Sequence, residues 1–297
     1  MVALVGEVGT QQQKDRHVTP YKISTITAVG DVGTIVDLGE MFRGLCRECF
    51  GRECVGRVVR AEFDGDSWGE VKPRKKRQKK QQQQQPPTTT KKAAVNFGNQ
   101  ATLVVRVPSS DRRVNVKVFR NGRVQLTGIK RIEEGREVVE HVATLLRGIG
   151  CVAATMIDYR VCLINSDFDI GFRVRRDALH RLVRERFPRL SCCYEPCIYP
   201  GVRIRYYWRD RGSVEPFVWE PGECACGGDV PCDGKGDGVG RCRKVTMSVF
   251  QSGKAIVVGA HTLEQLGDAY RFLVDRVVLS NRSAIELPAA GRCVVST

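Results

Sequence analysis

Four cysteines in one short stretch have the residue type and spacing of a metal site. Cys224, Cys226, Cys232 and Cys242 lie among the glycines 227, 228, 234 and 236. Cysteine thiolates are soft ligands that hold zinc tetrahedrally, and glycines allow the tight turns that such a site requires. The stretch has almost no apolar residues to bury, so a metal would give it a reason to fold. We therefore predict a structural zinc site, with a disordered loop of reduced thiols as the alternative.

The other reactive side chains do not form a recognisable centre. Cys46, Cys49 and Cys54 are only three ligands and need a fourth from elsewhere. The histidines show no metal-ligand spacing, and no phosphate-binding loop or nucleophile motif is present. These are His17, His141, His180 and His261. We predict that the protein is not an enzyme and requires no cofactor beyond the structural zinc.

The charge of the chain is unevenly distributed. The formal net charge is +15, from 48 basic and 33 acidic residues, and the stretch 72–92 is rich in Lys and Arg without any acid. A basic tract attracts nucleic acid, and KPRKKRQKK (Lys72–Lys80) also has the composition of a nuclear import signal. We expect a nuclear location, with a solvated charge block as the alternative. No apolar run reaches the roughly 18 residues that cross a bilayer, so no membrane partner is expected.

Two segments of the chain repeat each other. VKVFRNGRVQLTG (Val116–Gly128) aligns with MSVFQSGKAIVVG (Met247–Gly259), so Phe119 corresponds to Phe250. Upstream, DVG at residues 31–33 corresponds to DIG at residues 169–171. An internal repeat of this length indicates a fold built twice from one supersecondary unit.

The composition then divides the chain into four segments, two of which contain an insertion. The low-complexity stretch that contains the basic tract and five glutamines has no means of packing, and we predict that it belongs to an insertion. The predicted segments are a leader at 1–17, a first repeat at 18–150 with an insertion at 43–94, a second repeat at 151–280 with an insertion at 209–243, and a tail at 281–297.

Hydrophobic periodicity predicts the fold class. Val114, Val116 and Val118 alternate with polar residues, as in a strand with one buried face. Helical spacing follows each repeated segment. It is carried by Val138, Val142, Leu145 and Leu146 in the first repeat, and by Leu266, Ala269, Tyr270, Leu273, Val274 and Val277 in the second. We predict an α+β fold of two pseudo-symmetric repeats, in which an antiparallel sheet carries helices on one face and Phe119 and Phe250 on the other.

At these residues the chain resembles the TATA-box binding protein family. FRNGRVQLTG and FQSGKAIVVGA are similar to the family pattern F-x-S-G-K-x-V-x-T-G-A, and YEPCIYPG (Tyr194–Gly201) is similar to Y-E-P-E-L-F-P-G. The resemblance covers roughly 18–42, 95–208 and 244–280. It implies a curved, saddle-shaped sheet with helices on the convex face, which binds the DNA minor groove and bends the duplex.

The resemblance also implies roles for single residues. Phe119, Phe250 and Tyr199 match aromatic wedges, while the fourth wedge falls near Gln100 and Phe97. Phosphate contacts are implied for two symmetric pairs of cations, Arg106 with Arg205 on the strands and Arg123 with Lys254 at the turns. Thr127 matches a threonine of the concave face, and Val258 replaces its counterpart. Tyr194, Glu195 and Pro196 match the surface that contacts general transcription factor IIB, where Cys197 replaces an acidic residue.

Departures from the family pattern affect the expected specificity. The family places an asparagine on the first strand of each repeat, and here those positions are Thr25 and Leu163. Recognition of the DNA sequence then depends on the width and deformability of the groove, so we expect a relaxed or altered preference among A·T-rich promoters.

We predict a transcription initiation factor that bends promoter DNA and recruits a transcription factor IIB-like protein and the RNA polymerase initiation machinery. A remote lineage, such as a large DNA virus or a protist, would account for the departures. The alternative is a protein-binding saddle that has lost DNA binding and acts as an adaptor or regulator.

Overall fold

The computed structural model describes residues 17–46, 57–70, 98–210, 221–224, 226, 231–239 and 241–288. The chain divides into two compact units, Ile23–Ile164 and Met1–Lys22 together with Asn165–Thr297. The first unit contains the strands β1 (Lys22–Asp31, whose first residue belongs to the second unit), β2 (Val58–Phe63), β3 (Asp66–Gly69), β4 (Gln100–Arg106), β5 (Arg113–Phe119) and β6 (Arg123–Ile129), and the helices α1 (Leu38–Cys46) and α3 (Ile132–Gly148).

The strand β7 (Asp158–Asp169) begins in the first unit and ends in the second. The second unit continues with α4 (Arg176–Arg186), β8 (Ser191–Cys193), β9 (Val202–Trp208), β10 (Arg243–Val249), β11 (Lys254–Ala260), α5 (Leu263–Arg271), the π-helix η2 (Phe272–Val278), the 3-10 helix η3 (Leu279–Asn281) and α6 (Arg282–Ile285). Within the described residues the strands form one sheet in the order β3-β2-β4-β5-β6-β1-β7-β11-β10-β9-β8. This is an α+β fold with a large antiparallel sheet and few helices, so the predicted fold class is confirmed.

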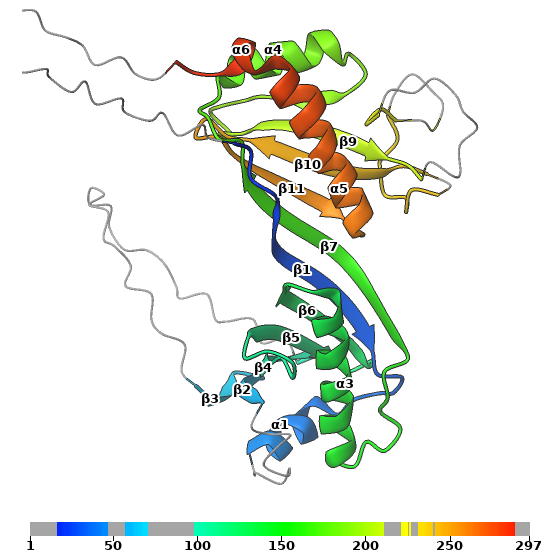
Figure 1. Cartoon of the computed structure of the whole chain (residues 1–297). Helices are drawn as coiled ribbons and strands as arrows, with labels where there is room; N and C mark the ends of the chain where they lie inside the picture. Colours follow the sequence, from blue (N-terminus) through cyan, green and yellow to red (C-terminus); the bar gives the residue numbers. More distant parts are fainter. Residues whose placement is uncertain are drawn as a thin grey trace, which may run out of the picture. The chain divides into compact units, whose positions relative to one another are not determined.

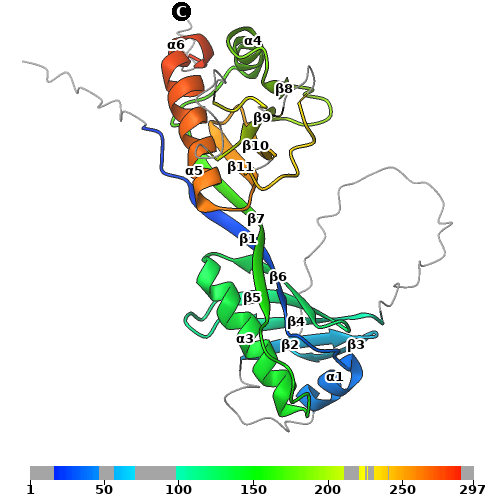
Figure 2. The same cartoon turned by 90° about the vertical axis from the view of Figure 1, so that its right-hand side faces the viewer.

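In each unit a long helix covers one face of the strands. In the first unit α3 packs against β6, and in the second α5 packs against β10 and β11 (Figures 1 and 2). Val138, Val142 and Leu146 are fully buried, and so are Leu266 and Leu273. The two predicted helix faces are therefore correct. Tyr270 differs because it is half-buried and its hydroxyl donates to the carbonyl of Thr19.

The two units repeat each other in backbone detail as well as in sequence. In each, an aspartate carboxylate accepts a hydrogen bond at 2.8 Å from a glycine two residues ahead, Gly33 in one unit and Gly171 in the other. In each, a glycine with positive φ closes the turn after the phenylalanine, at 85° for Gly122 and 88° for Gly253. An L-residue is strained at such φ values, which explains why glycine recurs at both turns.

The helix that follows each repeated hairpin begins in the same way. Glu134 is completely buried, and its carboxylate accepts hydrogen bonds from the backbone of Lys130 and Arg131 and pairs with Arg112. Gln265 takes this place in the second unit and accepts from His261 at 2.8 Å. Burial raises the pKa of Glu134, but the hydrogen bonds from Arg112, Lys130 and Arg131 outweigh it and hold that pKa below its ordinary value.

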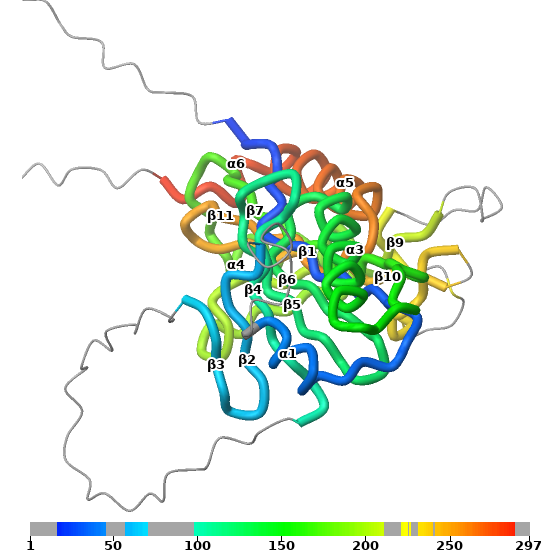
Figure 3. Tube along the Cα trace, turned by 90° about the horizontal axis from the view of Figure 1, so that it is seen from below, coloured from blue at the N-terminus to red at the C-terminus, as the bar shows by residue number. Residues whose placement is uncertain are grey.

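The structure differs from the predicted segment boundaries in three places. Residues 58–69, inside the predicted insertion at 43–94, form β2 and β3, because β2 pairs with β4 and extends the sheet (Figure 3). The units meet near residue 164 and not at 150, because the start of β7 belongs to the first unit. The predicted tail at 281–297 starts with the last residue of η3 and contains α6. Residues 1–16 of the predicted leader, the tract 71–97, and Cys49 and Cys54 lie outside the described residues.

Candidate nucleic-acid interface

Each unit has a sheet face that points away from its helices, which we call the outer face. In β5 the side chains of Val114, Val116 and Val118 are fully buried, while Asn115 and Lys117 on the other side are exposed. This alternation follows from the pleat of a strand with one face in the core. The outer face of the first unit therefore carries polar and cationic side chains over a rigid apolar layer.

Phe119 lies at the end of this outer face, next to a hollow. The turn after it is closed by the bond from Gly122 N to the carbonyl of Phe119 at 3.0 Å. The hollow has a volume of about 270 Å³ and is lined by Val29, Phe119, Asn121, Arg123, Gln125 and Arg160. It combines apolar and cationic groups in one recess beside an aromatic ring. Such a lining suits a phosphate backbone with a flat, partly apolar group next to it.

In the second unit the corresponding ring has an aromatic neighbour. The centroids of Tyr199 and Phe250 are 5.8 Å apart, with the ring planes tilted by 59°. The guanidinium of Arg203 lies over the Tyr199 ring at 5.4 Å from its centroid. Gly201 lies against both rings, because a Cβ added there would be 2.9 Å from Tyr199 Cε1 and 3.1 Å from Phe250 Cε1. The structure thus brings together the predicted aromatic pair. For the other predicted pair, Gln100 pairs with Phe119 in the strand register, whereas Phe97 lies outside the described residues.

The four cations assigned to phosphate contacts fall into two classes. Arg106 pairs with Asp111 at 2.6 Å, and Lys254 pairs with Asp169 at 2.9 Å. Arg123 is exposed and Arg205 is exposed with its Nη1 donating to Ser191 Oγ, a neutral partner. Among the described residues, neither Arg123 nor Arg205 has an acidic partner. These two arginines are therefore ready to bind a phosphate, whereas the other two must first share or leave a carboxylate.

The strand register corrects one predicted symmetry. Arg205 pairs with Thr246, four residues before Phe250, and Val104 pairs with Asn115, four residues before Phe119. The counterpart of Arg205 is therefore Val104, whereas Arg106 pairs with Arg113 farther along the hairpin. The two arginines are not a symmetric pair, because the loop between β4 and β5 shifts the sequence alignment. Thr127 and Val258 do correspond, since they pair with Asn115 and Thr246.

The positions that replace the family's asparagines lie on β1 and β7. Thr25 Oγ1 is buried and has no hydrogen-bond partner within the described residues, while Leu163 is apolar and half-buried. Two residues after Leu163, Asn165 has a buried Oδ1 that also lacks a partner in the described part of the chain. Sequence reasoning missed Asn165, although a residue two positions farther along a strand lies on the same face. It also missed Arg203, Gln125 and Arg160.

The segment predicted to bind a partner protein forms the loop between β8 and β9. Glu195 and Pro196 are exposed, and so are Cys197 and Ile198, which is 76% exposed. The Tyr194 ring is fixed by the Arg176 guanidinium at 5.3 Å from its centroid. The loop closes on itself through bonds from Ile198 N and Tyr199 N to the Glu195 carbonyl. It therefore presents an ordered, mixed apolar and acidic surface.

The second predicted insertion brings its four cysteines together. The sulfur atoms of Cys224, Cys226, Cys232 and Cys242 all lie within 4.8 Å of one another. Burial raises the pKa of Cys226, but hydrogen bonds from the Cys242 backbone and the neighbouring thiols outweigh it and lower that pKa. The pKa of Cys232 is raised, by burial and by the same neighbouring thiols. Three cysteines from different points of the loop thus meet the one that precedes β10.

Comparison with known proteins finds a curated relative and several solved structures. The chain is 25% identical over 276 residues to a protein named "TATA-box-binding protein-like" from Acanthamoeba polyphaga mimivirus, which covers 85% of this chain and 63% of that protein. The chain thus spans less than two thirds of the relative's length. The structure of Methanococcus jannaschii TBP matches with a TM-score of 0.44 and 17% identity, over 87% of this chain and 98% of that chain. No family model matches.

The sequence comparison supports a resemblance to a TATA-box-binding protein-like protein. The curated relative is similar along most of the chain, including both repeats. The α+β fold with one large antiparallel sheet agrees with that resemblance. Among the described helices, none is both long and apolar enough to cross a membrane.

Proposed function

We propose that the protein is a non-enzymatic transcription initiation factor that binds A·T-rich promoter DNA in the minor groove and bends it. The observation that carries the proposal is the repeated arrangement of an aromatic ring, a glycine turn and a cation at the end of each outer face. Phe119 and Arg123 form it in the first unit, and Phe250 and Lys254 form it in the second. Two copies of one arrangement suit a ligand with its own repeating backbone.

The rings have the properties that a DNA wedge requires. Wedging of side chains between base steps is the established mechanism of the TATA-box binding protein family, and we carry it over from that family. Unstacking a base step costs a few kcal/mol, so a wedge must be apolar and rigidly held. The rings of Tyr199 and Phe250 pack against each other, and the Arg203 guanidinium stacks on the Tyr199 ring. The pair can therefore enter the duplex without first losing side-chain freedom.

The polar groups of the outer faces support a relaxed sequence preference. Minor-groove edges distinguish mainly A·T from G·C pairs, and amide side chains are suited to reading them. With Thr25 and Leu163 in place of asparagines, recognition depends more on the width and flexibility of the groove. Asn165 Oδ1 and Thr25 Oγ1 have no partner among the described residues, but both atoms are buried, so neither can accept from a base unless its side chain moves.

We further propose that the loop containing Tyr194, Glu195 and Pro196 binds a transcription factor IIB-like protein and so recruits the RNA polymerase initiation machinery. The exposed Ile198 beside Glu195 supports this proposal, since an apolar side chain next to a charged one is typical of a protein contact. Cys197 in place of an acidic residue suggests a partner whose surface differs from that of the family's usual partner. Nuclear location, directed by Lys72–Lys80, completes the proposal.

One observation favours a second function, that of an adaptor that binds proteins and no DNA. Leu163 is apolar where the resemblance expects an amide, and the β8–β9 loop is exposed. An adaptor would use this loop and the helices, and its outer faces would bind no duplex.

A bending assay separates the two functions. We expect the protein to shift an A·T-rich duplex and to bring fluorophores at its two ends closer together. The double variant Phe119→Ala, Phe250→Ala should still fold, because both rings lie on the face opposite the core, but it should lose the bend. Leu279→Ala removes an exposed apolar side chain from η3 and serves as the matched control. An unchanged bend in the double variant would refute wedging, and absence of any DNA binding would favour the adaptor.

A further inference from the structure

We propose that Cys224, Cys226, Cys232 and Cys242 bind one Zn²⁺ ion as a tetrathiolate site that fixes the second insertion onto the β9–β10 hairpin. The proposal is independent of DNA binding. The sequence gives only the spacing of the four cysteines, whereas the structure gives the distances between their sulfur atoms and places the cluster beside β9 and β10.

The distances between the sulfur atoms fit a single ion. Zinc–sulfur bonds of about 2.3 Å place tetrahedral sulfurs about 3.8 Å apart. The four sulfurs lie within 4.8 Å of one another, and Cys226 and Cys242 are 3.5 Å apart. Small side-chain movements therefore complete the tetrahedron. A cluster of several iron atoms would hold its thiolates farther apart than one tetrahedron does.

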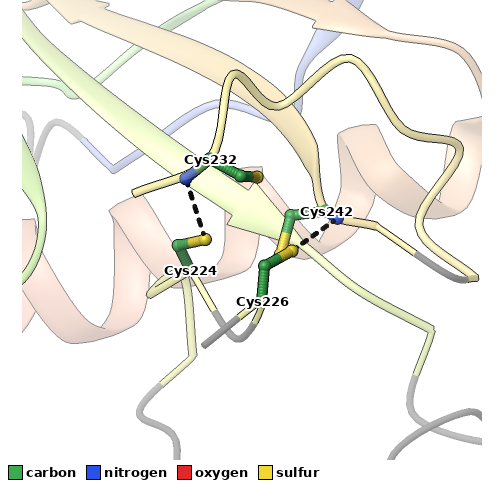
Figure 4. A group of neighbouring side chains, drawn as sticks. All are labelled: Cys224, Cys226, Cys232 and Cys242. Atoms are coloured by element: carbon green, nitrogen blue, oxygen red, sulfur yellow. Dashed lines mark hydrogen bonds between the residues drawn. The ribbon is translucent and has the colours of Figure 1, made fainter. Parts of the chain in front are cut away.

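The side chains converge from three directions, as Figure 4 shows. Cys224 and Cys226 are two residues apart in the first part of the insertion, Cys232 comes from farther along it, and Cys242 is the residue before β10. Backbone N–H groups donate to two of the sulfurs, from Cys232 to Cys224 Sγ at 3.2 Å and from Cys242 to Cys226 Sγ at 3.4 Å. Such donors stabilise thiolate charge and orient metal ligands.

The insertion is joined to the hairpin on both sides of the cluster. The Tyr207 amide donates to the Gly222 carbonyl and the Lys244 amide to the Gly234 carbonyl, each at 2.8 Å. Gly238 lies against the Trp208 ring so closely that an added Cβ would be 2.1 Å from it. These contacts hold the cysteine-bearing segments beside the ends of β9 and β10. A metal at this point would therefore tie the insertion to the sheet.

The surroundings can balance the charge of the bound ion. Four thiolates and one Zn²⁺ carry a net charge of −2, and each thiol that binds releases its proton to solvent. Lys235 and Arg241 both pair with the Asp233 carboxylate, at 3.7 and 3.4 Å, and Lys244 Nζ donates to the Asp233 carbonyl at 2.9 Å. These three cations and one carboxylate leave two positive charges in the same loop and hairpin. The described part of the insertion buries few apolar side chains of its own, so metal binding supplies much of its folding energy.

Elemental analysis of the full chain tests the site. Protein prepared under reducing conditions should contain one more zinc per chain than the Cys232→Ser variant. Cys151→Ser is the matched control, because it also removes one thiol, and it should keep the zinc of the wild type. Replacement of zinc by Co²⁺ should give the visible absorption of a tetrahedral tetrathiolate. Equal zinc in wild type and Cys232→Ser, or iron in place of zinc, would overturn the proposal.

A second measurement needs no variant and remains decisive if Cys232→Ser fails to fold. The wild type is alkylated before and after removal of metal with a chelator, and the labelled cysteines are identified by mass spectrometry. We expect the four cysteines to be protected before chelation and labelled afterwards, with increased hydrogen exchange in 221–244. Free labelling before chelation would overturn the site. So would two disulfides under reducing conditions, since these bring sulfurs to about 2.05 Å and leave no thiolate for a metal.

Discussion

Removal of single cations from the outer faces should reduce the salt dependence of DNA binding by unequal amounts. Arg205 has the neutral Ser191 as its partner, whereas Lys254 pairs with Asp169 at 2.9 Å. Each phosphate that a cation neutralises adds about −0.9 to the slope of log affinity against log salt. Arg205→Gln should therefore flatten the slope by about 0.9, and Lys254→Gln should flatten it less because Asp169 already neutralises that lysine.

The magnitude can be measured with a fluorescent A·T-rich duplex. Between 50 and 200 mM salt, a slope change of about 0.9 means that the Arg205→Gln variant weakens about 3.5-fold less than the wild type. Asp169→Asn should have the opposite effect, since it frees Lys254 and steepens the slope by up to about 0.9. The asparagine keeps a carbonyl oxygen for the Gly171 amide, so the turn is preserved. Arg181→Gln on α4 is the control and should leave the slope unchanged.

Two results would refute this reasoning. If Lys254→Gln flattens the slope as much as Arg205→Gln, the ion pair with Asp169 does not persist in solution or opens without cost. If neither substitution changes the slope while both weaken binding to one sequence, the two cations contact bases and the phosphate assignment is wrong.

Two further predictions concern single contacts, and a third concerns the basic tract. Gly201→Ala should reduce the DNA bend, because its Cβ would meet both rings of the Tyr199–Phe250 pair. Gly98→Ala is the control and should leave the bend unchanged, because its Cβ would meet nothing within 4 Å. Equal bends in the two variants would contradict the role of the ring pair. Glu134→Gln should lower the free energy of unfolding by about 1–3 kcal/mol at pH 7, because it removes a charged hydrogen-bond acceptor. The folded-state pKa of Glu134 lies below 4.5, so this stabilisation is present above about pH 4.5 and is lost as the pH falls through the folded-state pKa. Urea midpoints of variant and wild type should therefore converge in acid, and a constant difference would contradict the assignment. Deletion of Lys72–Lys80 should move a fluorescent fusion to the cytoplasm, while deletion of the glutamines 81–85 should not; nuclear accumulation of both would count against an import signal.

Local patterns predicted the parts of the fold that depend on periodicity. Alternation in Val114–Phe119 correctly assigned the buried and outer faces, because strand side chains alternate wherever one face is in the core. Helical spacing correctly assigned the buried face of α3. The alignment of the two repeated segments places Gly122 opposite Gly253, and both residues have positive φ in equivalent turns. Each of these features is determined by residues that are near one another in the chain.

Features that depend on pairing between distant segments were not predictable in this way. The sequence alignment made Arg106 the counterpart of Arg205, but the strand register assigns that place to Val104, since loop length shifts an alignment without changing the pairing of strands. The strands β2 and β3 escaped detection because they are short and adjoin a tract of low complexity. Cys224 and Cys242 come together because the insertion folds back onto the β9–β10 hairpin. The spacing of cysteines in the sequence does not determine that fold.

The outer faces of the two units share a scaffold but differ in chemistry, and this difference should produce an asymmetric DNA preference. Gln125 and Thr127 lie on β6 where β11 has Ile256 and Val258. A G·C pair adds an amino donor to the minor groove, and polar side chains can accept from it, whereas apolar ones leave it unpaired at a cost of about 1–3 kcal/mol. Base pairs against the second unit should therefore be restricted more strictly to A·T. In vitro selection should yield a site with one strict and one permissive half, and Val258→Thr should relax the strict half. Two halves of equal stringency would show that groove shape alone determines the preference.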